Sequence, residues 1–142
     1  SESLVRGIAR IAESIPVQRP ARQCLLAAAE GEEHTLPLNL AELCLRERGW
    51  DARWSGRATP TAEVARMVAS GSVDMVALTA SGAVQDRQVL SRALDVLEPL
   101  CRERDVVLVV GGSGPWPDRP AYASRVRRFA EFGNLLRDVR AA

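Results

Sequence analysis

The sequence has almost no net charge and few cysteines, and each scarcity argues against a class of function. The formal net charge of +1 excludes a strong nonspecific field towards nucleic acid or acidic lipid. The three cysteines, Cys24, Cys44 and Cys101, form no CxxC pair and are odd in number. We therefore expect reduced core thiols in a cytoplasmic protein rather than disulfides or a metal cluster.

Long apolar runs and catalytic motifs are also missing. No apolar run approaches the ~20 residues that a membrane span needs, and no secretory signal opens the sequence. There is no recognisable Ser–His–Asp order, metal-ligand cluster or P-loop lysine, so we expect no enzymatic activity of the chain itself. A length of 142 residues and a hydrophobic share of 46% fit one globular domain with a full core.

Hydrophobic periodicity predicts alternating helices and strands. We expect helices over 3–15, 35–48, 59–71 and 84–103, and strands over 22–29, 51–55, 73–79 and 106–110. The tail predicts a short helix near 119–125, a brief strand at 126–129 and a last helix over about 133–141. Such alternation is typical of α/β proteins. We predict a flavodoxin-like, Rossmann-type fold with a five-stranded parallel sheet in the order 2-1-3-4-5 and helices on both faces.

Two prolines divide the chain. Pro16 and Pro20 separate an N-terminal helix and linker, residues 1–20, from a main domain over residues 21–142. The chain starts within a helical pattern, so we expect it to be a fragment of a longer protein.

Polar and small residues gather in the loops after the first, third and fourth predicted strands. In an open α/β sheet such loops meet at the carboxyl edge, where ligands bind. They contain an imidazole, small hydroxyls and bare glycines, which suit a large flat or phosphate-bearing ligand. The residues concerned are Glu32, His34, Thr79, Ser81, Gly111, Gly112 and Ser113.

Two further groups lie close to these loops in the sequence. Trp116 can either stack on a ring system or pack within its loop. Arg125, Arg127 and Arg128 form a short basic cluster, which we interpret as a solvated face, with a partner or phosphate contact as the alternative.

Three motifs, in this order, resemble those of the cobalamin-binding domains of corrinoid proteins and of light-sensing MerR-type regulators. That family carries DxHxxG, then SxL or SxT, then GG. The corresponding residues here are Glu32-x-His34-x-x-Pro37, Thr79-Ala80-Ser81 and Gly111-Gly112. The likeness covers residues 22–112 well and the tail loosely.

The resemblance implies cobalamin, a tetrapyrrole, as the cofactor. His34 would be the axial metal ligand of its cobalt, and the nucleotide tail would lie in a slot beside the sheet. The predicted cofactor-binding residues are Glu32, His34, Thr79, Ser81, Gly111, Gly112 and Trp116. The motif is partly degenerate, because Glu32 replaces Asp, Pro37 replaces Gly and Thr79 replaces Ser. Haem, or no ligand at all, is the alternative.

The expected function is a ligand-sensing regulatory domain, as part of a transcriptional regulator. The single predicted helix before the sheet favours this role over a corrinoid methyl carrier, which usually has a longer helical cap. The methyl carrier remains an alternative, as does a haem-binding or ligand-free domain that acts by protein–protein contact. We expect a homo-oligomer or an effector or DNA-binding domain as the partner, with no membrane and no direct nucleic-acid contact. A response-regulator receiver is set aside, because no phospho-acceptor aspartate follows the third strand at Thr79.

Overall fold

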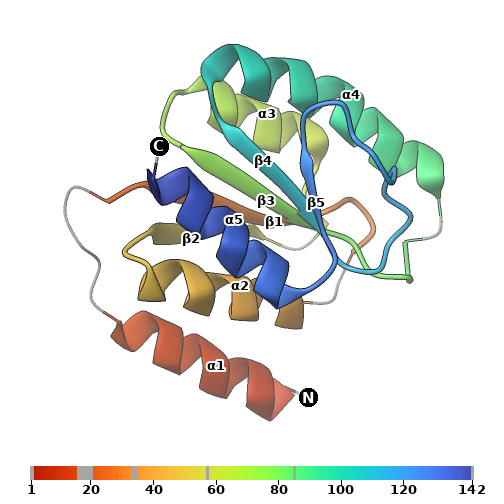
Figure 1. Ribbon diagram of the computed structural model, residues 1–142. Helices are drawn as coiled ribbons and strands as arrows, with labels where there is room; N and C mark the ends of the chain where they lie inside the picture. The colour runs from red at the N-terminus through yellow and green to blue at the C-terminus, as the bar shows by residue number, and fades with distance from the viewer. Residues whose placement is uncertain (1, 16–20, 33–34, 57, 85, 142) are drawn as a thin grey trace.

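The computed structural model describes the whole chain except residues 1, 16–20, 33–34, 57, 85 and 142. Over the described residues, helices and strands alternate as predicted (Figure 1). The helices are α1 (Glu2–Ser14), α2 (Leu36–Glu47), α3 (Thr61–Ala69), α4 (Arg87–Arg104) and α5 (Phe129–Ala141). The strands are β1 (Gln23–Ala28), β2 (Asp51–Gly56), β3 (Met75–Thr79), β4 (Val107–Gly111) and β5 (Ser124–Val126).

The strands form one parallel sheet in the order β2-β1-β3-β4-β5, which confirms the predicted flavodoxin-like topology. The register brings the strand ends level. Thr79 pairs with Ala28 on one side and with Gly111 on the other, and Gly111 pairs in turn with Val126. The loops that follow β1, β3 and β4 therefore leave the sheet at the same edge.

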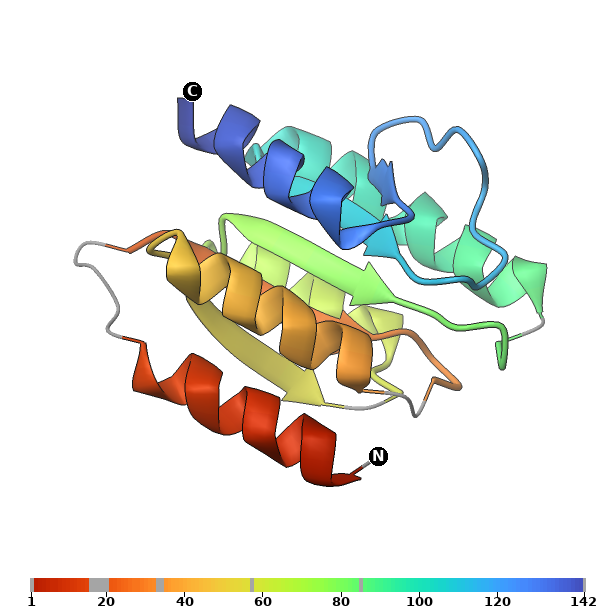
Figure 2. The same ribbon diagram turned by 60° about the horizontal axis from the view of Figure 1, so that its bottom comes forward.

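Two hydrophobic layers cover the sheet, one on each face. Side chains alternate along each strand, so Val76 and Leu78 of β3 face α3 and α4, whereas Met75 and Ala77 face α2 and α5. Strands buried on both faces are typical of a parallel sheet. Figure 2 shows α1 along the outer side of α2, away from the sheet.

The longest helix has well-defined ends. The Asp86 side chain accepts a hydrogen bond from the backbone N–H of Gln88 at 2.9 Å and so caps the start of α4. This cap explains why α4 begins at Arg87 rather than near residue 84. Its last turn closes at Asp105, whose φ of 56° lies in the left-handed region. Within the described part of the chain, no helix is both long and apolar enough to cross a membrane.

The predicted short helix near 119–125 is wrong. Glu98, on α4, accepts hydrogen bonds from the backbone N–H groups of Tyr122 and Ala123, the latter at 2.8 Å. These N–H groups are thereby used by a side chain, and Pro120 disfavours a helix just before them. The segment runs as a loop into β5, and α5 begins at Phe129 instead of near 133.

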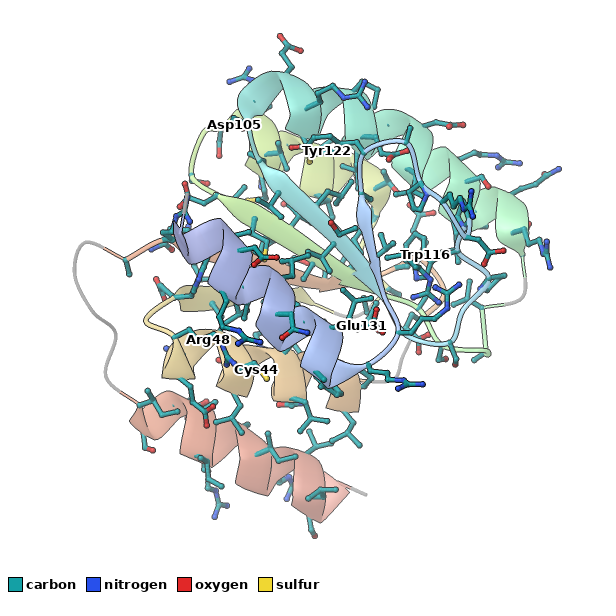
Figure 3. The ribbon with its side chains drawn as sticks, viewed as in Figure 1. Cys44, Arg48, Asp105, Trp116, Tyr122 and Glu131 are labelled. Carbon is teal, nitrogen blue, oxygen red and sulfur yellow. The ribbon has the colours of Figure 1, made fainter. Side chains whose placement is uncertain are left out.

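Two of the three cysteines lie in the core as predicted, and the third lies at its margin. Cys24 and Cys101 are buried free thiols, and Cys44 is half-buried on α2 (Figure 3). Burial raises the pKa of Cys24 above its usual range and that of Cys101 to about 11. Both thiols therefore stay protonated at neutral pH and behave as small hydrophobic residues.

Candidate functional site

A cavity of about 160 Å³ lies between the sheet and the helices α2 and α5. Its floor is made by the ends of β3 and β4, at Ala77, Thr79, Val109 and Gly111. Its walls are apolar and come from the two helices, with Pro37, Leu38 and Ala41 on one side and Phe129 and Phe132 on the other. The cavity therefore suits a flat apolar group that enters from the carboxyl edge of the sheet.

The Thr79 hydroxyl is the polar group on the cavity floor. Thr79 is only 6% exposed, and its hydroxyl makes no hydrogen bond to a described residue, although it is not among the fully buried polar atoms that lack a partner. Because Thr79 lines the cavity, its hydroxyl is available to form a hydrogen bond with a ligand there.

The two predicted glycines after β4 have different reasons to be glycine. Gly112 has a φ of +87°, and a Cβ there would lie 2.2 Å from the carbonyl oxygen of Ala80, so the fold itself requires glycine. A Cβ on Gly111 would meet only the Val126 carbonyl oxygen, at an ordinary 3.6 Å. Packing thus leaves room for a larger residue at position 111, which lines the cavity.

Glu32 is fully buried and ties three loops together. Its carboxylate oxygen Oε2 accepts from the backbone N–H of Ser81 at 2.5 Å. Its own backbone N–H donates to Ala29, and its carbonyl accepts from Ala58 at 3.0 Å. His34, the predicted metal ligand, lies outside the described residues, so its role stays a prediction. Ser81 is half-buried, and its hydroxyl accepts from the N–H of Ala83, as a turn cap does.

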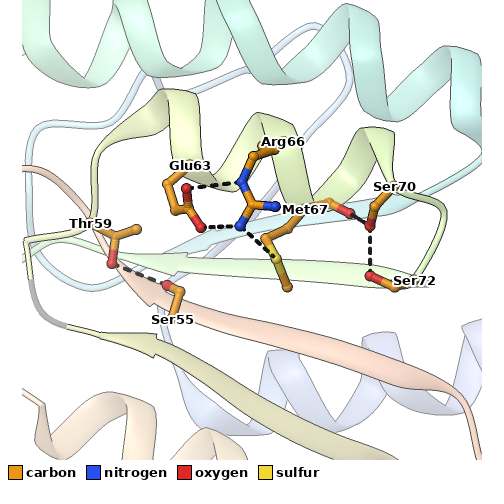
Figure 4. Close-up of polar contacts among 7 residues, drawn as sticks. All are labelled: Ser55, Thr59, Glu63, Arg66, Met67, Ser70 and Ser72. Carbon is orange, nitrogen blue, oxygen red and sulfur yellow. Dashed lines mark hydrogen bonds and ion pairs between the residues drawn. The ribbon is translucent and has the colours of Figure 1, made fainter.

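The loop after β2 is held by a second set of polar contacts (Figure 4). The Thr59 hydroxyl donates to the Gly56 carbonyl at 2.9 Å and lies 3.1 Å from the Ser55 hydroxyl. The Thr59 backbone N–H donates to Ala28, the last residue of β1. The frame around the carboxyl edge is therefore fixed by hydrogen bonds between loops rather than by packing alone.

Trp116 belongs to the opposite side of the sheet from the cavity. It is 5% exposed and packs in the hydrophobic cluster that faces α3 and α4. Its indole N–H donates to the Gly111 carbonyl at 2.8 Å, which closes the loop between β4 and β5 (Figure 3). Of the two alternatives for Trp116, the structure favours loop packing, and its indole is not among the described residues that line the cavity.

Two aromatic and two basic residues line the cavity although the sequence did not predict them there. Phe129 and Phe132 were missed because the last helix was predicted to begin near 133. Arg127 and Arg128 line the cavity at its rim, although the sequence favoured a solvated face for them. Among the described residues, no group of three or more His, Cys, Asp or Glu side chains forms a metal site.

The fold is shared with proteins that carry corrinoids. It resembles a cobalamin-binding protein from Desulfitobacterium hafniense at 18% identity and a TM-score of 0.63, over 84% of this chain and 59% of that one. It resembles the monomethylamine corrinoid protein of Methanosarcina barkeri at 18% identity and a TM-score of 0.67, over 97% of this chain and 64% of that one. It also resembles one chain of the methanol:cobalamin methyltransferase complex of Methanosarcina barkeri, at 18% identity and a TM-score of 0.66, over 99% of this chain and 55% of that one.

These comparisons confirm the predicted resemblance at the level of the fold. The chain has the α/β fold of cobalamin-binding domains and spans between 55% and 64% of the similar chains. No protein-family model matches the sequence, and no curated protein matches it either.

Proposed function

We propose that this domain binds a corrinoid, with the nucleotide tail of the cofactor in the cavity between the sheet, α2 and α5. The observation that carries the proposal is the apolar cavity between the sheet, α2 and α5, on whose floor Thr79 offers a hydroxyl to a ligand. A heterocycle with a free ring nitrogen can fill such a cavity and accept a hydrogen bond from the Thr79 hydroxyl. Thr79 stands at the motif position where the family has serine, so the same hydroxyl chemistry is available.

The other residues of the cavity fit this ligand. Gly111 leaves the floor open beside Thr79, and Leu38 and Phe132 offer apolar walls to a ring. Pro37 occupies the first turn of α2, where a missing N–H breaks no helical hydrogen bond. Its ring forms part of the wall and so narrows the cavity relative to glycine without closing it, which is compatible with a bound tail.

His34 completes the proposal as the axial ligand that the resemblance implies. It follows the fully buried Glu32 by two residues and precedes Thr35, the N-cap of α2. A bound corrinoid supplies a cobalt centre that can take up and release a methyl group. The chain's own residues would hold the tail, orient the ring at the carboxyl edge and keep water from the cavity.

Of the two roles weighed from the sequence, the methyl carrier has the better support. Two of the similar structures are a monomethylamine corrinoid protein and a methanol:cobalamin methyltransferase complex, whereas none of the three is described as a regulator. We therefore propose that the domain presents its cofactor to a separate catalytic partner and catalyses no reaction alone.

The test is cofactor binding, followed by absorption spectroscopy, with hydroxocobalamin and, separately, haem. We expect the unmodified protein to retain cobalamin and the His34→Ala variant to lose at least about tenfold in affinity and to show a changed spectrum, as the loss of a metal ligand does. A Ser70→Ala variant, on the exposed end of α3, serves as the control. Retention of haem alone, or of neither group, would overturn the proposal.

The carrier role has its own test. We expect the size measured by light scattering to be the same with and without cobalamin, in light and in dark. A change of oligomeric state with ligand or light would favour a sensor instead, because a ligand shifts such an equilibrium only through different affinities for the two states.

A further inference from the structure

Positive charge surrounds one side of the cavity mouth. The turn from β5 into α5 places Arg127 and Arg128 on the rim, next to the apolar wall residue Phe129, which is 44% exposed. The start of α5 adds the partial positive charge of a helix N-terminus, which is partly offset by Glu131 in the first turn, whose carboxylate accepts from the Arg127 backbone N–H at 3.2 Å. The cavity is therefore lined by two arginine residues as well as by apolar side chains.

The arginines of this turn are not equally available. Arg125 serves the fold, because its guanidinium donates to the carbonyls of Gly112 at 2.8 Å and Val126 at 2.9 Å. Burial lowers the pKa of Arg125, and the positive charge of Arg127 lowers it further. Asp118 and Glu131 act in the opposite direction, so the turn carries charges of both signs.

Arg127 and Arg128 are the groups that can reach a ligand. Arg127 forms an ion pair with Asp118 at 2.9 Å, but both side chains are exposed, so the pair contributes little to stability. Arg127 can therefore leave Asp118 to pair with an anionic ligand. Within the described part of the chain, the Arg128 guanidinium forms no hydrogen bond or ion pair. A guanidinium matches the geometry of a phosphate with two parallel hydrogen bonds.

We propose that Arg128, assisted by Arg127, binds the phosphodiester of the nucleotide tail while the apolar cavity holds the heterocycle. This inference rests on the proposed function and adds to it a preference: the domain selects a complete cobalamin over a corrinoid without the nucleotide. The cavity alone would accept any flat apolar group, whereas the arginines favour a ligand that carries an anion beside that group.

The test compares ligands with and without the phosphate by calorimetry on the full chain. The ligands are cobalamin, cobinamide (which lacks the nucleotide), and α-ribazole, the tail nucleoside, with and without its 3′-phosphate. We expect the phosphate to strengthen α-ribazole binding roughly tenfold, the effect of one charge-assisted hydrogen bond. The double variant Arg127→Gln/Arg128→Gln should abolish this gain and weaken cobalamin binding while it leaves cobinamide unaffected.

Arg104→Gln is the matched control, since it removes the same charge from an exposed position at the far end of α4. It should keep the full phosphate preference. An equal preference in the double variant and the unmodified protein would overturn the inference alone. Inorganic phosphate that binds as tightly as α-ribazole phosphate would also overturn it, because the site would then be a simple anion site. An unmodified protein that binds neither cobalamin nor cobinamide would overturn the proposed function as well.

Discussion

Gly111 and Gly112 are neighbours in sequence, yet the structure predicts opposite consequences when each is replaced by alanine. At Gly112 the new Cβ would lie 2.2 Å from the Ala80 carbonyl oxygen, on a backbone with a φ of +87°. At Gly111 the new Cβ would find an ordinary contact at 3.6 Å, and it would project from a residue that lines the cavity. One substitution should therefore damage the fold, and the other should damage only the binding of a ligand.

The size of each effect follows from these contacts. For Gly112→Ala, the left-handed backbone costs about 1–2 kcal/mol and the overlap a further 1–3 kcal/mol or so. A loss of about 3 kcal/mol corresponds to a fall in Tm of roughly 6–12 °C for a domain of this size. For Gly111→Ala, the stiffer unfolded chain should raise stability by up to about 1 kcal/mol. Its methyl group should weaken cobalamin binding about tenfold, a cost of about 1.4 kcal/mol.

The assay combines thermal unfolding without ligand and titration with cobalamin. Gly7→Ala is the control, because a Cβ there meets nothing within 4 Å and lies in α1, away from the cavity. It should bind cobalamin as the unmodified protein does. A Gly112→Ala variant that melts within 2 °C or so of the unmodified protein would refute the close approach to Ala80. Unchanged cobalamin affinity in Gly111→Ala would show that the cavity is not the ligand slot.

Three further changes test the cavity and the core. Thr79→Val keeps the side-chain shape and removes the hydroxyl that lines the cavity. Urea unfolding should show equal or higher stability, and calorimetry should show cobalamin affinity reduced roughly tenfold. Lower stability would mean that the hydroxyl has a hydrogen-bond partner in the protein. Pro37→Gly should widen the cavity and raise cobalamin affinity, at a cost of about 0.5–1 kcal/mol in unfolding free energy. A fall in affinity would show that the Pro37 ring does not hinder the bound tail. Burial raises the pKa of Cys101 from 9.0 to about 11, so the thiol ionises at lower pH in the unfolded chain than in the folded protein. The unfolding free energy should therefore decline as the pH rises through this range. A Cys101→Ala variant should lack the part of the decline that this thiol causes.

The fold could be predicted from the sequence because periodicity and turn residues agree over most of the chain. The apolar run at 106–110 and the glycines after it define a strand and its exit, and the structure places β4 over Val107–Gly111. The tail could not be predicted in the same way. The backbone at Ala123 is held by the carboxylate of Glu98 on α4, which is distant in sequence, and no local sequence pattern reveals such a contact.

The candidate site was predictable in its motif residues and not in its walls. Thr79 and Gly111 follow apolar strands, so their place at the carboxyl edge follows from topology. Trp116 shows the limit of that reasoning, because a loop residue can turn to either face of a sheet and only its contacts decide which. Phe132 shows another limit, since a helix that starts earlier than expected carries its apolar face into the site.

Glu32 stabilises the loops at the edge of the sheet where the cofactor is proposed to bind. A carboxylate that is fully removed from water needs hydrogen bonds to offset its desolvation, and the Ser81 N–H supplies one. That bond fastens the loop after β1 to the loop after β3, the strand whose last residue, Thr79, lines the cavity floor. Glu32 therefore has a structural role that does not depend on any cofactor. An acidic residue at this motif position is explained by the loop geometry alone, so the case for a corrinoid rests on the cavity and on Thr79 rather than on Glu32.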